Sequence, residues 1–224
     1  MAIDKRRMTA ADAVAGVADG STVLISGFGG AGFANTLIRA LCDAGPRDLT
    51  LVVNSATHRL SSTHLLIEAG LVRKVICSAA RGHDKTGLSA FEQLYKDGRI
   101  ELEVLPQGTF AESIRAGGAG IPAYFTPTGF GTELAAGKET RRFGDRDYVL
   151  EPAISGEVAL VRGDLADRWG NLTFRHAQMN FGPAMATAAK LVIAEVRAIS
   201  DTPIPPEQVQ LSGVFVDRIL AVGA

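Results

Sequence analysis

Short runs of apolar residues recur along the chain, separated by segments in which apolar residues return every three or four positions. The runs are rich in β-branched residues, which favours strands. They cover residues 22–26, 49–53, 72–77, 100–105, 148–151, 158–162, 191–195 and 214–222. Nearly continuous apolar strands of this kind predict a parallel sheet that is covered on both faces.

Helices are predicted between these runs, over residues 35–44, 63–69, 90–97 and 182–190. In the first of them, Leu37, Ile38 and Leu41 share one face. The alternation predicts an α/β fold with a single open, mostly parallel sheet and helices on both faces, forming one domain over residues 1–224. Residues 117–146 interrupt the alternation with dense glycine and proline and are predicted to form shaped loops.

Composition and charge narrow the choice of partners. The net charge of −1 provides no overall field that would attract nucleic acid or an anionic membrane, so neither is an expected partner. No apolar run reaches the roughly 18 residues of a membrane-spanning helix. Cys42 and Cys77 stand alone, without the spacing of a disulfide framework or a metal site, which favours a reducing compartment. We therefore expect a cytoplasmic protein.

A glycine-rich turn joins the first predicted strand to the first predicted helix. Residues 27–32 satisfy G-x-G-x-x-G in the strand–turn–helix context that dinucleotide sites require. The helix N-terminus would offer unpaired N–H groups to an anion. However, the second strand ends at Asn54 and Ser55, without the carboxylate that holds a ribose. The turn therefore indicates a bound anion or polar cofactor, with NAD disfavoured; a tight turn without any ligand is the alternative.

No complete catalytic constellation is visible. The four histidines are His58, His64, His83 and His176, and no metalloprotease, nucleophile-elbow or metal-cluster pattern includes them. His58 follows the strand that ends at Asn54, so it is either a residue of the site or an ordinary surface histidine. No metal is expected. The residues by themselves would favour a binding protein.

Several motifs together resemble the A (α) subunit of family I coenzyme A transferases. They cover nearly the whole chain in the expected order, which makes them more specific than the glycine turn alone. They lie at residues 19–32, 105–112 (L-P-Q-G-T-F-A-E), 125–132, 137–139, 167–175, 180–183 and 213–218. The resemblance implies the open CoA-transferase (NagB/RpiA-like) sheet. Residues 72–77 and 100–105 bring the chain nearest to transferases that act on 3-oxoadipate or other 3-oxo acids.

The resemblance also implies a divided active site. In this family a glutamate of the B subunit carries CoA from succinyl-CoA to the acceptor acid, and it lies in an S-E-N-G-like motif that this sequence lacks. The expected partner is thus a B subunit, in a heterodimer or heterotetramer. The CoA thioester would be a substrate, with no permanently bound cofactor. The favoured acceptor is 3-oxoadipate, with acetoacetate also open.

The resemblance assigns site residues on this chain. Gln107 would donate a hydrogen bond to the oxyanion of the tetrahedral intermediates; the alternative is that it only caps a strand–loop junction. The residues expected to bind substrate or CoA are Gly27, Phe28, Gly29, Gly30, Gly32, Asn54, Gly108, Thr128 and Gly129. The chain departs from the family pattern at Ser26, Ala34, residues 53–56 and residues 176–179, and the last two departures concern the expected acyl pocket.

Two other functions remain open. A CoA-thioester hydrolase of the same fold would admit an activated water where a transferase excludes it. A nucleotide- or sugar-phosphate-binding protein would use the same type of sheet without a second catalytic chain.

Overall fold

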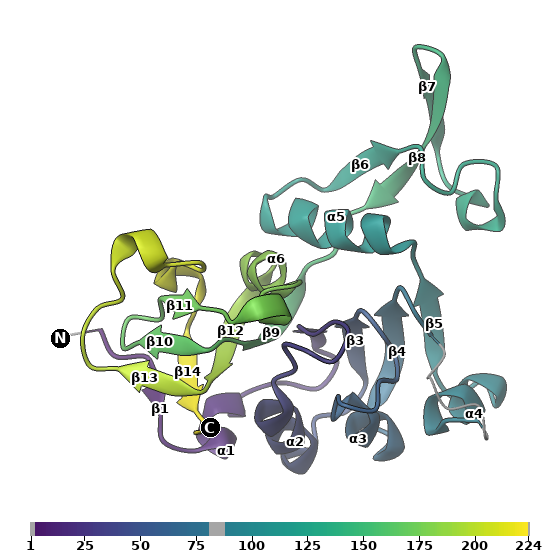
Figure 1. Cartoon of the computed structure of the whole chain (residues 1–224). Coiled ribbons are helices and arrows are strands. Elements are labelled where there is room, and N and C mark those ends of the chain that lie inside the picture. Colours follow the sequence, from purple (N-terminus) through teal and green to yellow (C-terminus); the bar gives the residue numbers. More distant parts are fainter. Residues whose placement is uncertain (1–2, 81–87, 224) are drawn as a thin grey trace.

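The centre of the protein is an open, parallel sheet (Figure 1). The computed structural model describes residues 3–80 and 88–223. The strand order is β1-β14-β12-β9-β2-β3-β4-β5, and every neighbouring pair is parallel. In chain order these strands are β1 (Arg6–Arg7), β2 (Thr22–Ile25), β3 (Leu49–Val53), β4 (Val72–Cys77), β5 (Glu101–Val104), β9 (Gly156–Arg162), β12 (Ala189–Val196) and β14 (Arg218–Ala221). The predicted fold class is confirmed.

Helices cover both faces of this sheet. Successive residues of a strand point to opposite faces, so Val23 and Ile25 of β2 enter one hydrophobic cluster while Leu24 enters the other. Side chains of four helices complete the first cluster: α1 (Ala10–Val14), α2 (Asn35–Ala44), α3 (Thr63–Glu68) and α4 (Ala90–Lys96). The second lies against α5 (Gln107–Gly118) and α6 (Gly182–Thr187). Burial on both faces explains why the central strands are apolar throughout.

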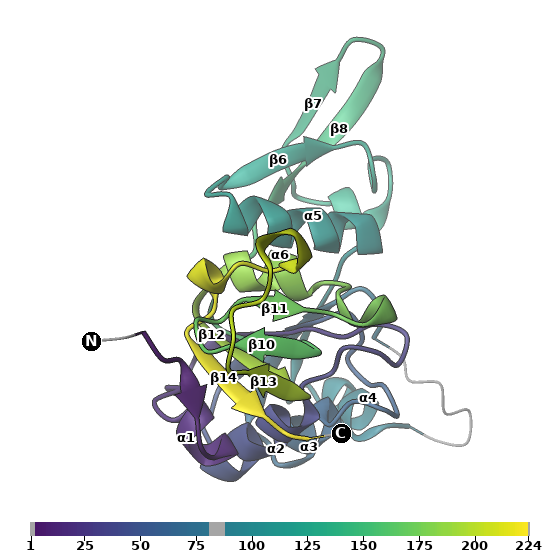
Figure 2. The same ribbon diagram turned by 60° about the vertical axis from the view of Figure 1, so that its left-hand side comes forward.

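Two small sheets supplement the central one. An antiparallel sheet of β6 (Ala123–Thr126), β8 (Arg146–Pro152) and β7 (Thr140–Phe143) projects beyond α5, as both views show (Figures 1 and 2). The other sheet joins β11 (Leu172–Thr173), β10 (Leu165–Asp167) and β13 (Ala198–Ser200).

The projecting sheet corrects the expectation of irregular loops over residues 117–146. Phe143 packs edge-to-face on Phe125 and on Tyr148, with ring centroids 5.4 and 5.3 Å apart. These cross-strand aromatic contacts support the strands, while glycines such as Gly129 and Gly144 adopt positive φ in the turns between them. A 3-10 turn at Glu133–Ala135 completes the segment.

Several predicted elements differ from the structure in extent or place. The helix predicted over residues 182–190 ends at Thr187, and β12 begins at Ala189. The strand predicted over 148–151 is part of β8 and lies in the projecting antiparallel sheet, not in the central one. The helix predicted over residues 35–44 coincides with α2, but α5 was not predicted. The strand predicted over 214–222 is wrong in its first part, because a 3-10 turn at Gly213–Phe215 precedes β14. Further 3-10 turns lie at His176–Gln178 and Pro206–Gln208. The single-domain organisation stays a prediction. In the part of the chain that the structure describes, no helix is long and apolar enough to cross a membrane.

The strand order reverses once, between β2 and β9. From β2 the chain adds β3, β4 and β5 toward one edge, and it later adds β9, β12 and β14 toward the other. In open α/β sheets, ligands bind outside the carboxyl ends of the strands at such a reversal. The fold therefore predicts a ligand site at the carboxyl ends of β2 and β9.

Candidate functional site at the carboxyl edge of the sheet

Polar side chains stand along the carboxyl edge of the central sheet. Because its strands are parallel, all their carboxyl ends meet at this one edge. Across the strand order from β12 to β5, these residues are Glu195, Arg162, Ser26, Asn54, Ser78 and Gln107. Residues up to 169 positions apart in the sequence thereby face one region.

Asn54 and Gln107, both expected from the sequence, lie in contact. Gln107 Nε2 donates to Asn54 Oδ1 at 2.9 Å, and Ser78 Oγ donates to the same oxygen at 2.9 Å. Asn54 is buried, whereas Gln107 is exposed at the first position of α5 and Gly108 is exposed beside it. The amide of Gln107 is thus anchored through one N–H, on an exposed residue at the edge of the sheet.

The glycine turn after β2 is closed on itself. Phe28 and Ala31 exchange two backbone hydrogen bonds of 2.9 and 3.0 Å. Gly27 and Gly32 have φ of 135° and 79°, and a Cβ on them would collide with the Phe33 ring and with the Asn180 side chain. Since only glycine tolerates both constraints, part of the glycine pattern is explained by this close packing.

Two side chains fasten the turn to the rest of the edge. Gly27 N donates to Asn180 Oδ1 at 3.0 Å, and Asn180 Nδ2 donates to the carbonyl oxygen of Ala31 at 3.2 Å. Ser26 Oγ donates to the carbonyl oxygen of Gly32 at 2.8 Å. Ser26, a departure from the family pattern, is therefore a buried anchor of the turn.

The N-terminus of α2 is occupied by a carboxylate of the chain itself. Glu195 Oε2 accepts hydrogen bonds from the backbone N–H groups of Thr36 (2.8 Å) and Leu37 (3.0 Å). Its Oε1 accepts from Arg162 Nη1 at 2.6 Å. The expectation that this helix end offers unpaired N–H groups to a ligand anion is wrong, because Glu195 takes the place of the ligand. The nucleotide-binding alternative loses its main support.

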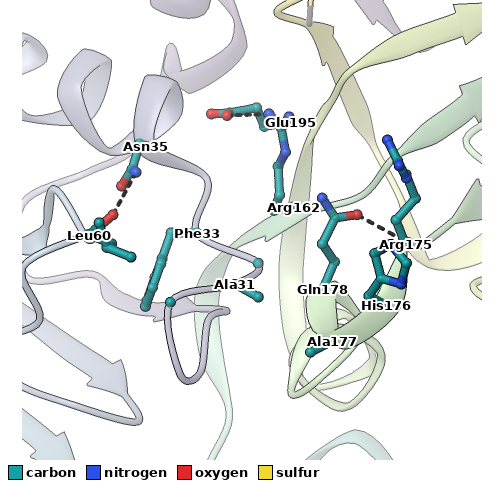
Figure 3. Close-up of a pocket in the computed structure, with 12 residues that line it drawn as sticks. Ala31, Phe33, Asn35, Leu60, Arg162, Arg175, His176, Ala177, Gln178 and Glu195 are labelled. Carbon is teal, nitrogen blue, oxygen red and sulfur yellow. Dashed lines mark hydrogen bonds and ion pairs between the residues drawn. The ribbon is translucent and has the colours of Figure 1, made fainter.

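A cavity of about 550 Å³ opens at the carboxyl edge of the sheet, between the glycine turn after β2 and residues 175–178 (Figure 3). Its volume lies in the range typical of small-molecule sites. The glycine turn, Phe33 and Leu60 form one side, and Arg162 with residues 175–178 forms the other. Its lining residues are Gly30, Ala31, Gly32, Phe33, Asn35, Leu60, Arg162, Arg175, His176, Ala177, Gln178 and Glu195. The predicted residues Gly30 and Gly32 thus border a cavity at the reversal of strand order.

Charged groups beside this cavity influence one another. Arg197 donates to Asp164 through Nε and Nη2 at 2.9 and 3.1 Å. These hydrogen bonds lower the pKa of Asp164, and the positive charges of Arg197, Arg175 and Arg162 add to the effect. The carboxylate of Asp164 is thus already paired with Arg197.

Other predicted residues lie elsewhere. Thr128 and Gly129 are in the projecting sheet, in the loop after β6, where the Gly129 carbonyl oxygen accepts from Thr132 Oγ1 at 2.7 Å. Neither lines the cavity, and their binding role stays a prediction. His58 lies against the Phe33 ring, with ring centroids 5.2 Å apart, behind the glycine turn. His83 lies outside the described residues.

Phe28, the remaining aromatic candidate, links the turn to α5. It is exposed and packs edge-to-face on Phe181, and Phe181 packs in the same way on Phe110 of α5. The turn and the helix that begins at Gln107 are therefore parts of one packed unit. Gly29 lies at the tip of the turn with φ of 58° and open space around it.

Sequence reasoning missed Ser78, Arg162, Arg175, Gln178 and Glu195. The one available signal was position, because Arg162 and Glu195 end strands that are otherwise apolar. His176 and Gln178 fall within the segment noted as a departure from the family pattern. Within residues 3–80 and 88–223, no three His, Cys, Asp or Glu side chains gather as a metal site would require.

Comparison with known proteins finds relatives over nearly the whole chain. The family model described as coenzyme A transferase matches residues 7–221. The A subunit of the 3-oxoadipate CoA-transferase of Pseudomonas putida is 48% identical over 221 residues, which cover 98% of this chain and 94% of that protein. The A subunit of a succinyl-CoA:3-ketoacid coenzyme A transferase of Xanthomonas campestris is 46% identical over 218 residues, covering 96% and 88%.

Solved structures share the fold. An acyl-CoA transferase from Escherichia coli O157:H7, in a thioester complex with CoA, superposes with a TM-score of 0.84 at 22% identity, covering 98% of this chain and 50% of that one. Glutaconate coenzyme A-transferase from Acidaminococcus fermentans gives a TM-score of 0.84 at 19% identity, covering 98% and 76%.

Proposed function

The chain belongs to the coenzyme A transferase family, and from that premise we propose that it is the A (α) component of an enzyme that moves CoA from succinyl-CoA to a 3-oxo acid. The favoured acceptor is 3-oxoadipate, with acetoacetate as the second choice. The two relatives described above, named for 3-oxoadipate and for 3-keto acids, support both acceptors.

The proposal of a divided active site rests on the hydrogen bonding and burial of Glu195. It is the glutamate that lines the cavity, and its two oxygens are engaged by Thr36, Leu37 and Arg162. A carboxylate committed in this way, and 3% exposed, is a poor nucleophile. The nucleophilic glutamate is therefore assigned to a B subunit that closes over the carboxyl edge, in a heterodimer or heterotetramer.

In the proposed reaction, the partner's glutamate carboxylate attacks the thioester carbonyl of succinyl-CoA. The tetrahedral intermediate expels the CoA thiolate and leaves a mixed anhydride. The thiolate then attacks the glutamyl carbonyl of the anhydride, which releases succinate and forms a glutamyl thioester. The acceptor carboxylate reverses these two steps and leaves as its CoA thioester. CoA is thus a substrate, and no permanent cofactor enters the scheme.

Gln107 is the group of this chain that would act on each tetrahedral intermediate. One N–H of its Nε2 is engaged by Asn54, and the second would donate to the oxyanion. A donor held in place before the reaction is worth about 3–4 kcal/mol in other enzymes. The glycine turn would complete the wall against which the acyl group lies.

Location and partners complete the proposal. Cys42 and Cys77 are free thiols, consistent with the expected cytoplasmic location. The expected ligands are an acyl-CoA and a carboxylic acid, and neither nucleic acid nor a membrane has a place in the scheme.

The test is to purify the chain alone and together with its B subunit. The pair should transfer CoA from succinyl-CoA to a 3-oxo acid, and the chain alone should not. When the pair has been incubated with acyl-CoA, borohydride should trap a glutamyl thioester on the B subunit. Transfer by the isolated chain would contradict the divided site. Hydrolysis of the thioester without transfer would favour the hydrolase alternative.

A further inference from the structure

Four polar side chains of the lining have contrasting hydrogen bonding: Glu195 and Asn35 on the one hand, Arg162 and Gln178 on the other. Both oxygens of Glu195 accept hydrogen bonds, as described above. Asn35 Oδ1 accepts from Ser62 N at 2.8 Å, while its Nδ2 donates to the carbonyl oxygen of Leu60 at 2.9 Å. The side-chain acceptors of these two lining residues are thus already used.

The hydrogen-bond donors on the opposite side of the cavity are not yet used. Gln178 Oε1 accepts from the backbone N–H of Arg175 at 2.9 Å, and among the described residues Gln178 Nε2 has no partner. Arg162 uses Nη1 for Glu195, and its other side-chain N–H groups have no partner in residues 3–80 and 88–223. In Figure 3 the side chain of Gln178 lies between those of Arg162 and Arg175. The three side chains therefore offer several unused N–H donors, of Arg162, Arg175 and Gln178, side by side.

Among the described residues that line the cavity, Arg175 is an arginine without a carboxylate partner. Arg162 is balanced by Glu195, and Asp164 is balanced by Arg197. Arg175 is exposed and makes no ion pair with any residue of the described ranges. An unused guanidinium beside unused amide and guanidinium N–H groups matches the two oxygens of a carboxylate.

The backbone of this segment supports a binding role. His176 has φ of 50°, a left-handed conformation that is uncommon outside glycine. Such residues cluster at ligand sites, where the surrounding structure enforces them. Here the Gln178 side chain on Arg175 N, together with Asn180 Nδ2 on the carbonyl oxygens of Ala177 (2.8 Å) and Gln178 (3.1 Å), holds the segment in place.

We propose that Arg175, assisted by Gln178 and Arg162, binds the second carboxylate of a dicarboxylic acyl group, the one remote from the reacting carbon. This inference rests on the proposed transferase function and deepens it. Arg175 then selects 3-oxoadipate over 3-oxo acids that carry a single carboxylate.

The test uses the assembled enzyme with Arg175→Leu, Arg175→Lys and the control Arg99→Leu. Arg99 is exposed at the opposite, amino-terminal edge, just before β5. The measured quantity is kcat/KM for two acceptors, 3-oxoadipate and its monomethyl ester at the remote carboxylate. In a ping-pong reaction, each kcat/KM reports only the half-reaction of that acceptor. Inhibition constants of adipate and hexanoate give the same comparison without turnover.

We expect Arg175→Leu to lower kcat/KM for 3-oxoadipate by about 10- to 100-fold. The value for the monoester should stay within about twofold. Arg175→Lys should recover part of the loss, and Arg99→Leu should behave as wild type. The inhibition constant of adipate should rise in Arg175→Leu, and that of hexanoate should not.

Three results would overturn the inference. Equal losses of kcat/KM for both acceptors would mean that Arg175 binds the CoA phosphates or takes part in the reaction itself. Loss of assembly with the B subunit, measured by size-exclusion chromatography, would make Arg175 an interface residue. Unchanged kinetics in Arg175→Leu would show that Arg175 has no role in binding the acceptor. If the wild-type pair transfers CoA to neither acceptor, the proposed function fails instead.

Discussion

Asn54 holds the carboxamide of Gln107 in a fixed orientation. Its Oδ1 accepts from both Gln107 Nε2 and Ser78 Oγ, and its Nδ2 donates to Ser55 Oγ at 3.1 Å. Every atom of this amide except one N–H is committed, so Asn54 cannot turn without breaking several bonds. Gln107 is exposed, and this contact is what keeps it from sampling other rotamers.

We therefore expect Gln107→Ala to lower kcat by about 100-fold, because an oxyanion donor acts only in the transition state. KM for the acceptor should change little. Ser78→Ala should have a smaller effect, about three- to tenfold in kcat, because one neutral hydrogen bond to Asn54 is lost while Gln107 remains. Steady-state kinetics of the assembled enzyme measure both. An effect of Gln107→Ala confined to KM would contradict the oxyanion role.

At the scale of elements, Glu195 joins α2 to β9 and β12. It lies near the carboxyl end of β12, on one side of the cavity, and its carboxylate replaces the missing side-chain cap at Ala34. An anion at this place also complements the partial positive charge of the helix end. The helix after the glycine turn is thus fixed relative to the strand that carries Arg162.

Glu195→Gln should destabilise the protein by about 2–3 kcal/mol, because it leaves Arg162 without its counter-charge in a largely buried place. The matched control is Glu157→Gln. That glutamate also accepts from a backbone N–H, of Thr22 at 2.8 Å, but its side chain is 48% exposed against 4% for Glu195. The control should cost less than about 1 kcal/mol. Urea unfolding of both variants gives the comparison. Because Glu157 is paired with the exposed Lys190, equal losses would show that the buried Glu195–Arg162 pair contributes no more than an exposed one.

The sequence allowed the parallel core to be predicted because burial on both faces makes its strands continuously apolar. It did not predict α5, which begins at Gln107 and Gly108 without a capping side chain. Glu195 also escaped detection, since its partner Thr36 lies 159 residues away and only the fold brings the two together. Gln107 was found through a motif and Asn54 through its place at the end of a predicted strand, and their contact became visible only in the structure.

At the scale of the whole molecule, the site lies on the rigid central sheet, and a small antiparallel sheet projects from this core. Strands β9 and β12 contribute Arg162 and Glu195 to the cavity lining, and both have strands on either side and helices on both faces. The sheet of β6, β8 and β7 extends away from this centre (Figure 2), and all four residues of β7 are exposed. A small antiparallel sheet with so little burial contributes little stability of its own.

In the chain without its B subunit, hydrogen–deuterium exchange should therefore be slower in the central sheet than in the projecting sheet. Amides of β2, β9 and β12 should exchange slowest, because only global unfolding releases them. Amides of β7 should exchange fastest among the strands, because the hairpin with β8 can open while the central sheet stays intact. Peptide-resolved mass spectrometry measures both. Protection of β7 equal to that of β9 would mean that the projecting sheet unfolds only with the core, so that the cavity and the projection form one cooperative unit.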